Sequence, residues 1–195
     1  MLILGLTGSI GMGKSATARM FAAYGCPVHD ADAVVHDLYE SDAVPLIEAA
    51  FPGTTGPGGV DRGRLSDQVV GQPDHLKRLE QIVHPLVRNR EIAFLKQSEA
   101  KGVRAAILEI PLLFETSADA RCDAVIVCSA PADVQRARVL KRPEMTPDKL
   151  DGILARQMPD PEKRQRAHFV VDTSRGFDSA ERQVAAILRA VSAMS

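Results

Sequence analysis

The chain has 195 residues, of which 45% are apolar and 25% charged, and its formal net charge is -1. This composition is typical of one folded α/β domain with insertions, and the near-neutral charge argues against nucleic-acid binding through a broad basic face. The three cysteines match neither a zinc site nor a disulfide framework, and no apolar run approaches the roughly 20 residues of a membrane span. We therefore expect a cytoplasmic protein with no nucleic-acid or membrane partner.

Short apolar runs recur along the chain and predict strands. The first is Leu2–Leu6, and a shorter one follows at residues 27–29. The others are Val103–Ile110, Ala124–Cys128 and His168–Val171. Fully apolar runs of this length are typical of strands that are buried on both faces. The pattern thus predicts an α/β fold, with a parallel sheet and helices on both of its faces.

Helical patterns separate these runs. The predicted helices are Lys14–Ala23, Ala33–Leu38, Asp74–Lys96, Ala132–Leu140, Pro147–Gln157 and Ser179–Met194, the last with Asp178 as its N-cap. Residues 52–63 are rich in glycine and proline and predict a loop. This loop lies in a long excursion, residues 34–102, between the second and third strands. We expect the excursion to be an insertion that binds a substrate.

A phosphate-binding loop follows the first predicted strand. Residues 8–15 read GSIGMGKS and match GxxxxGK[ST], between a strand and a helix as this motif requires. The glycines let backbone N–H groups approach phosphate oxygens, Lys14 reaches the β and γ phosphates, and Ser15 offers a hydroxyl to Mg²⁺. We expect ATP to be bound by Gly11, Met12, Gly13, Lys14, Ser15 and Ala16. The fold class is then that of the P-loop nucleoside triphosphatases and nucleoside kinases.

The motif alone leaves several functions open. The chain has no DxxG sequence, and its one asparagine, Asn89, is not part of an NKxD motif, so a GTPase is disfavoured. A small-molecule kinase, an ATP-driven mechanical protein and a nucleotide-binding regulator remain.

Two aspartates follow the second predicted strand. In a doubly wound sheet, Asp30 and Asp32 lie at the carboxyl edge, on the side of the phosphate loop. A carboxylate there can accept the proton of an acceptor hydroxyl, and Asp32 is the candidate base. Asp30 is a candidate for organising Mg²⁺ water or the loop. The alternative is that both aspartates only cap the helix that follows.

Three further segments carry candidate residues. Glu109, near the end of the run Val103–Ile110, is a candidate for holding Mg²⁺ water, and Leu112, Leu113 and Phe114 form either an apolar floor for the acceptor or ordinary core. His84 precedes Pro85, which should start or kink a helix, and the histidine either binds an acceptor phosphate or caps the kink.

The basic segment 135–157 predicts a lid. An arginine that closes on the transferred phosphate stabilises the charge that develops there. Arg142, just before a proline, is the candidate lid arginine, and Arg138 is the second choice.

The chain resembles the dephospho-coenzyme A kinases over nearly its whole length. The resemblance rests on LTGSIGMGKS at residues 6–15, Asp30-Ala31-Asp32, HPLV at 84–87, PLLFE at 111–115, Gln135 with Arg138 and Arg142, RQM at 156–158, and Val171-Asp172. It implies transfer of the ATP γ phosphate to the ribose 3′-hydroxyl of dephospho-coenzyme A, with Asp32 as the base and Mg²⁺ as the cofactor.

The resemblance also implies three parts. These are a nucleotide-binding core (1–33, 103–135 and 163–195), a helical acceptor-binding insertion (34–102) and a lid (136–162). The catalytic residues are then Asp32, Lys14 and Arg142, and the acceptor contacts are Asp32, His84, Leu113 and Phe114.

Two positions depart from the family pattern. His168 stands where an aspartate is usual, and Thr173 where an asparagine is commoner. A histidine cannot supply a permanent negative charge, so helix-capping or lid-pairing by that carboxylate is in doubt. We expect little effect on the reaction.

Two rival functions stay open at the level of sequence. The first is a kinase of the same fold that phosphorylates a nucleotide or nucleoside. The second is an ATP-binding regulator without an acceptor. The paired aspartates and the long insertion weigh against the regulator.

Overall fold

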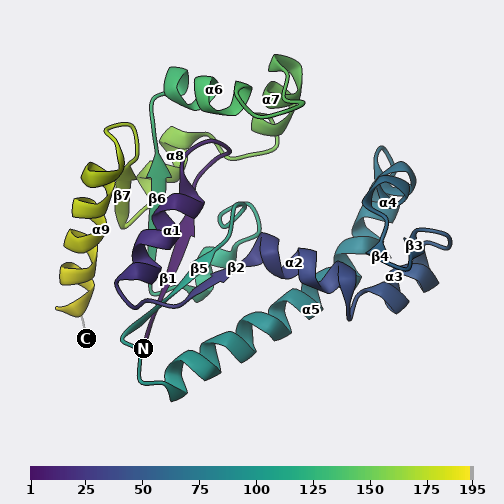
Figure 1. Ribbon diagram of the computed structural model, residues 1–195, viewed down its shortest axis with the longest axis horizontal. Coiled ribbons are helices and arrows are strands. Elements are labelled where there is room, and N and C mark those ends of the chain that lie inside the picture. Colours follow the sequence, from purple (N-terminus) through teal and green to yellow (C-terminus); the bar gives the residue numbers. More distant parts are fainter. Residues whose placement is uncertain (194–195) are drawn as a thin grey trace. The chain divides into compact units, whose positions relative to one another are not determined.

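The computed structural model describes residues 1–193, and these divide into two compact units. The first unit consists of residues 1–29 together with the chain from residue 98 onward, and the second consists of residues 30–97. The predicted insertion, 34–102, thus starts and ends a few residues later than the second unit. Figure 1 shows the elements of both units.

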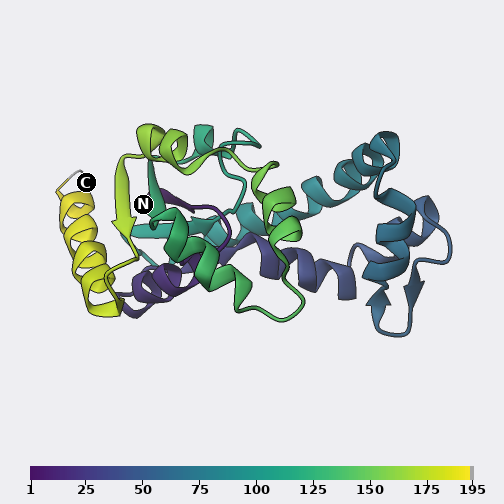
Figure 2. The same cartoon turned by 90° about the horizontal axis from the view of Figure 1, so that it is seen from above.

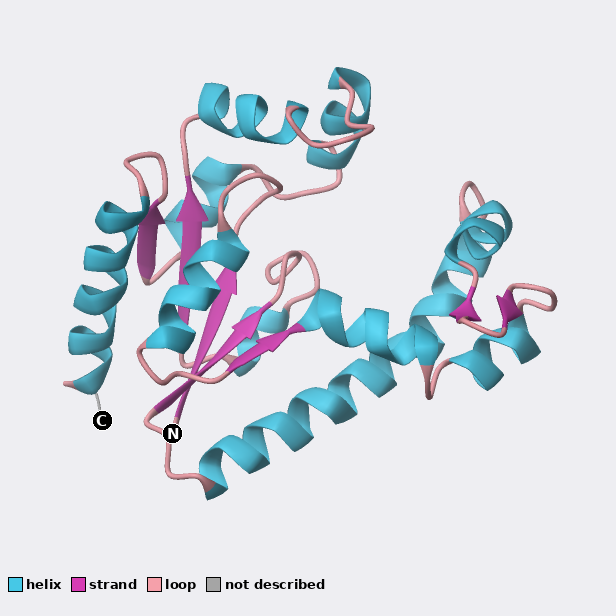
Figure 3. Ribbon diagram, in the orientation of Figure 1, coloured by secondary structure: helices cyan, strands magenta, loops and turns pink. Residues whose placement is uncertain are grey.

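The main sheet has five strands in the order β2-β5-β1-β6-β7. The strands are β1 (Leu2–Thr7), β2 (Val28–Asp30), β5 (Ala105–Glu109), β6 (Ala124–Ser129) and β7 (Phe169–Asp172). The pairs β1–β5, β1–β6 and β6–β7 are parallel, with Leu4 opposite Ile107 on one side and Ala124 on the other. Figure 3 shows the strands side by side. All five predicted strands are confirmed, with shifts of one or two residues at most of their ends.

Helices cover both faces of this sheet, as the apolar runs predict. Helices α1 (Lys14–Ala23) and α9 (Phe177–Ser192) lie side by side on one face, and α8 (Asp160–Arg166) packs near β6 on the other (Figures 1 and 2). The central strand is apolar on both sides because both sides are covered, and Leu4 and Leu6 are fully buried. Cys128 of β6 is also fully buried.

The second unit has a core of its own. Its helices are α2 (Ala31–Glu40), α3 (Val44–Ala50), α4 (Arg62–Val69) and α5 (Pro73–Ala100), of which α5 continues into the first unit. Four large apolar side chains from this region form the centre of a buried cluster: Leu38, Ile47, Phe51 and Leu65. An insertion with a separate core can hold its shape without the sheet.

The prediction that residues 52–63 form a loop is partly wrong. This segment contains an antiparallel hairpin of β3 (Thr55–Gly56) and β4 (Gly59–Val60), and α4 begins inside it. Gly59 has φ 96°, and a Cβ there would lie 2.3 Å from the carbonyl oxygen of Tyr39. Glycine is therefore required at this position, because β4 passes close to the end of α2.

Three details of the predicted helices also need correction. Gly176, not Asp178, is the N-cap of α9, and Asp178 lies in its first turn. Pro85 does not start a helix, because α5 runs through it. Helix α7 (Pro147–Leu154) ends three residues before the predicted Gln157.

The remaining helices complete the chain. Helix α6 spans Ala132–Leu140 as predicted, and a short 3-10 helix, η1, spans Ala118–Arg121. The predicted end of the last helix, Met194, lies outside the described residues. Within residues 1–193, we find no helix with the length and apolarity needed to cross a membrane.

Candidate active site

The phosphate loop connects β1 to α1 at the carboxyl edge of the sheet. Gly8, Gly11 and Gly13 have φ of 149°, 78° and 85°, which other residues rarely adopt. A Cβ on Gly8 would lie 2.5 Å from the carbonyl oxygen of Cys128, so the loop can pass over β6 only with glycine here. Gly13 is the N-cap of α1 and forms no side-chain cap, which leaves the first N–H groups of α1 for an anion.

Two oxygen-bearing side chains meet below this loop. Ser15, in the first turn of α1, donates a hydrogen bond of 2.9 Å from its hydroxyl to Oε1 of Glu109, at the end of β5. Glu109 is only 5% exposed. The structure thus brings together the serine and the glutamate that the sequence singled out as candidates for the metal site. A hydroxyl and a carboxylate are suitable ligands for a hard divalent cation.

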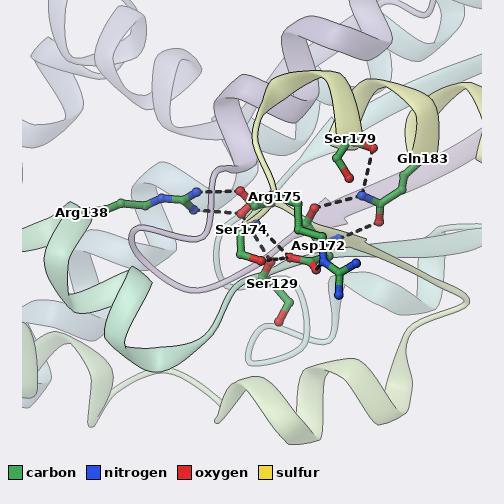
Figure 4. A network of polar contacts seen from close by, with 8 residues as sticks. Ser129, Arg138, Asp172, Ser174, Arg175, Ser179 and Gln183 are labelled. Atoms are coloured by element: carbon green, nitrogen blue, oxygen red, sulfur yellow. Dashed lines mark hydrogen bonds and ion pairs between the residues drawn. The ribbon is translucent and has the colours of Figure 1, made fainter.

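The segment after β7 is tied to the phosphate loop by Thr173. Its hydroxyl donates a hydrogen bond of 3.0 Å to the carbonyl oxygen of Met12 and accepts one of 2.9 Å from Nη1 of Arg138. Nη2 of Arg138 also donates to the Thr173 carbonyl oxygen, at 2.6 Å. Figure 4 shows Arg138 extending from α6 toward this segment. The sequence marks Thr173 only as a departure from the family pattern, and it does not predict this contact.

Asp172 stabilises the same segment. Its carboxylate accepts hydrogen bonds from the hydroxyl and backbone N–H of Ser174, at 2.6 and 2.8 Å, and lies 3.3 Å from Nε of Arg175 (Figure 4). The bonds from Ser174 hold the pKa of this carboxyl below its usual value. Gln183 of α9 accepts a hydrogen bond from the backbone N–H of Asp172 and donates one to the Asp172 carbonyl oxygen, at 2.9 Å each. The turn after β7 is thus fixed from several directions.

A cavity of about 320 Å³ opens between these elements. Its walls include the phosphate loop, Arg138, Arg142 and the segment from Thr173 to Phe177. The residue Phe177 is 72% exposed. A cavity of this size next to a phosphate loop can take the base and ribose of a nucleotide.

The two lid arginines differ in their surroundings. Arg138 is held by Thr173 and Gly11, with an Nη1 to oxygen distance of 3.5 Å to the latter, so it is not free to swing. Arg142 follows α6, is exposed, and within the described residues forms no ion pair. Arg142 is thus the better candidate of the two for a lid arginine, and this role stays a prediction.

The predicted acceptor residues lie in different settings. Oδ1 of Asp30 accepts the backbone N–H groups of Asp32 and Ala33, at 3.0 Å each, so Asp30 caps α2. Asp32 lies in the first turn of this helix, and its role as the base stays a prediction. His84 is exposed on α5.

The apolar candidates are mostly buried. Leu113 is fully buried and Phe114 nearly so, whereas Leu112 is exposed. A Cβ added to Gly5 would lie 3.0 Å from the Leu113 side chain, and the guanidinium of Arg166 lies 4.4 Å from the centre of the Phe114 ring. These surroundings explain both residues as packing. Contact of either with the acceptor stays a prediction, and Leu112 is the more accessible of the three.

Comparison with known proteins identifies the family. A family model described as dephospho-CoA kinase matches residues 2–179. The chain is 59% identical to a dephospho-CoA kinase of Rhodopseudomonas palustris strain HaA2 over 194 residues, which cover 100% of this chain and 98% of that protein. The chain belongs to the dephospho-CoA kinase family. A second member, from Brucella melitensis, is 56% identical over 192 residues, which cover 98% and 96% of the two chains.

Solved structures agree with the fold of this family. The crystal structure of TT1252 from Thermus thermophilus is similar with a TM-score of 0.86 and 33% identity, over 97% of each chain. A dephospho-CoA kinase from Campylobacter jejuni has a TM-score of 0.65 at 21% identity, over 97% of this chain and 96% of that one, and shows the same fold. The predicted P-loop kinase fold is thus confirmed.

The unusual His168 has a structural role in this member of the family. The ring Nδ1 of His168 accepts a hydrogen bond from the backbone N–H of Val125 at 3.1 Å, and the backbone N–H of His168 donates to the Val125 carbonyl oxygen at 2.9 Å. The ring therefore extends the ladder between β6 and β7 by one pair.

Thr173 yields a first testable prediction. Thr173→Val keeps the shape of the side chain but removes the donor to Met12 and the acceptor for Arg138. We expect the free energy of unfolding to fall by about 1–3 kcal/mol, because polar groups are left unpaired in a site that is only 9% exposed. The KM for ATP should rise about fivefold or more, which corresponds to about 1 kcal/mol of lost binding free energy because 1.4 kcal/mol is a factor of ten.

Denaturant unfolding and steady-state kinetics measure both effects. Thr116→Val is the matched control, because this exposed threonine also donates to a backbone carbonyl, that of Leu112, at 2.7 Å. An unchanged KM for ATP in Thr173→Val would contradict the role of this residue.

Proposed function

We propose that the chain transfers the γ phosphate of ATP to the ribose 3′-hydroxyl of dephospho-CoA, giving CoA and ADP, the last step of CoA biosynthesis. The observation that carries this proposal is the 59% identity to a dephospho-CoA kinase over the whole chain. The phosphate loop with its Ser15–Glu109 pair supports it, since these are the parts a kinase needs.

The residues have separate tasks in the reaction. Lys14 and the N–H groups of the phosphate loop bind the β and γ phosphates. Asp32 accepts the proton of the 3′-hydroxyl as its oxygen bonds to the γ phosphorus, while the bond from that phosphorus to the bridging oxygen breaks and ADP leaves. Asp30 keeps the first turn of α2 in place by capping it.

The donor set fits Mg²⁺. Within residues 1–193, no three His, Cys, Asp or Glu side chains gather where they could hold a metal ion. Magnesium sites in kinases use one or two protein oxygens together with water and substrate phosphates. The hydroxyl of Ser15 and the carboxylate of Glu109 would supply those oxygens, the carboxylate directly or through water. When bound, the ion would neutralise charge on the phosphate oxygens.

The test is an ATP-consumption assay with different acceptors. Dephospho-CoA is offered in one reaction, and nucleoside monophosphates and adenosine in others, and the product is analysed for a 3′-phosphate. We expect rapid turnover with dephospho-CoA alone. Turnover with a monophosphate instead would favour a nucleotide kinase, and slow hydrolysis with every acceptor would favour a nucleotide-binding regulator. Either result would overturn the proposal.

Arg142 gives the prediction for the lid. Arg142→Ala should lower the turnover number at least about tenfold, because a mobile guanidinium stabilises the charge on the transferred phosphate. The matched control is Lys141→Ala, which removes the same charge from the adjacent exposed position. Steady-state kinetics at saturating ATP and acceptor measure the effect. Near-normal turnover of Arg142→Ala would remove this residue from the mechanism.

A further inference from the structure

Ile10, the third residue of the phosphate-loop motif, is bound on both of its backbone polar groups by glutamine side chains. Its N–H donates to Oε1 of Gln157 at 3.1 Å, and its carbonyl oxygen accepts from Nε2 of Gln135 at 2.8 Å. The two glutamines lie 147 and 125 residues away in the sequence. The predicted function gives neither of them a task.

These glutamines come from the two ends of the predicted lid segment, residues 136–162. Gln135 belongs to α6, immediately before that segment, and is buried. Gln157 follows α7, near the end of the segment. One residue of the phosphate loop therefore contacts both ends of the lid.

The position of Gln157 is fixed by its neighbour. The N–H of Met158 donates to Oε1 of Glu115 at 2.7 Å, and the same oxygen lies 2.9 Å from Nζ of Lys163. Lys163 belongs to α8 and is fully buried, and it also donates to the Pro111 carbonyl oxygen at 3.4 Å. An ion pair with a fully buried lysine thus holds the end of the predicted lid where the Gln157 amide reaches the loop.

The bonds to Ile10 determine where the next backbone donor points. The Ile10 carbonyl and the Gly11 N–H belong to one planar trans peptide, so they point in opposite directions. When Gln135 holds the carbonyl, it also fixes the direction of the Gly11 N–H. The bond from Ile10 to Gln157 fixes the preceding peptide in the same way.

We infer that Gln135 and Gln157 are positioning residues for phosphoryl transfer, which hold Ile10 from the two ends of the lid so that the loop N–H groups stay aimed at the transferred phosphate. The inference rests on the proposed function. Binding energy that is realised mainly in the transition state affects the turnover number more than the affinity for product. The two glutamines should therefore act on catalysis more than on nucleotide affinity.

The test compares Gln157→Met, Gln135→Met and the double variant. Methionine has a similar length and lacks the amide, and Gln157 is partly exposed, so its variant should fold. We expect each single change to lower kcat with dephospho-CoA on the order of tenfold to a hundredfold, as for small misplacements in active sites. The dissociation constant for ADP, measured by calorimetry, should change less than about threefold, which is well below a factor of ten.

The double variant tests whether both glutamines act through Ile10. Changes that share one partner are not additive, so the double variant should be no more than about threefold slower than the slower single variant. Gln68→Met is the matched control, because this glutamine also donates to a backbone carbonyl, that of Pro52, but in the second unit.

The outcomes separate this inference from the proposed function. If the wild-type protein does not phosphorylate dephospho-CoA, the proposed function fails. If it does, three results would each overturn the inference. The folded Gln157→Met variant could keep its kcat, or it could lose ADP affinity by the same factor as kcat. The kcat losses of the two single variants could also multiply in the double variant. Thermal unfolding of each variant shows that the comparison is made on folded protein.

Discussion

Asp32→Asn should lower the turnover number for dephospho-CoA by about 10² to 10⁴, with ATP binding retained. The asparagine has the same shape but cannot take the proton of the 3′-hydroxyl. Asp32 lies in the first turn of α2, so removing its charge should reduce stability by only about 0.3–1 kcal/mol through the helix dipole. The loss of activity would therefore report on chemistry and not on folding.

Asp30→Asn is the matched control for this prediction. Asn caps helices as well as Asp does, so the bonds from the N–H groups of Asp32 and Ala33 can be kept. We expect its turnover number to stay within about threefold of wild type, a change well below one decade. Single-turnover measurements on both variants decide between the two aspartates. A slow Asp30→Asn with a normal Asp32→Asn would reverse the assignment.

Lys163→Met should reduce the free energy of unfolding by about 1–3 kcal/mol, because it leaves the partly buried carboxylate of Glu115 without its partner. Burial alone would raise the pKa of Glu115, but the bonds from Lys163 and from the Met158 N–H outweigh it and hold that pKa below its usual value of 4.5. In the wild-type protein the ionised carboxylate thus adds stability above about pH 4.5, and this contribution is lost as the pH falls through the lowered pKa.

The pH dependence makes this prediction specific. Without Lys163, burial should raise the pKa of Glu115, so the carboxyl is neutral at low pH and costs less to bury. The difference in stability between variant and wild type should shrink as the pH falls from 8 toward about 4. Urea unfolding at several pH values measures it. Arg136→Met, which breaks an exposed pair with Asp151, should cost less than about 1 kcal/mol at every pH. A loss below about 1 kcal/mol for Lys163→Met as well would be inconsistent with a stabilising pair at the buried lysine.

Local patterns predicted the parts of the fold that local physics controls. Helices α1 and α6 have the expected bounds, since one follows a phosphate-binding motif and the other a proline at its start. Helices α3, α4 and α8 were not predicted, because each has eight residues or fewer and is too short to show a clear helical period. Helix α7 is equally short but lies in the segment 147–157, which was predicted as one longer helix. The hairpin of β3 and β4 was not predicted either, since two-residue strands carry no periodicity.

The site shows the same division between local and distant contacts. Ser15 and Glu109 could be identified from sequence because Ser15 ends the phosphate-loop motif and Glu109 ends a recognisable strand. The bond from Thr173 to Met12 could not, since 161 residues separate them and a threonine hydroxyl has no sequence signature. The burial of Leu113 was not predicted because an apolar run has the same sequence whether it forms core or the floor of a site.

The buried sulfur of Cys128 has a consequence for an enzyme whose proposed acceptor ends in a thiol. Burial raises the pKa of this thiol to about 12, which disfavours the thiolate near neutral pH. Thiol–disulfide exchange proceeds through the thiolate and needs access to it. We therefore expect no mixed disulfide between an oxidised acceptor and this sulfur, because it is fully buried and its pKa is raised.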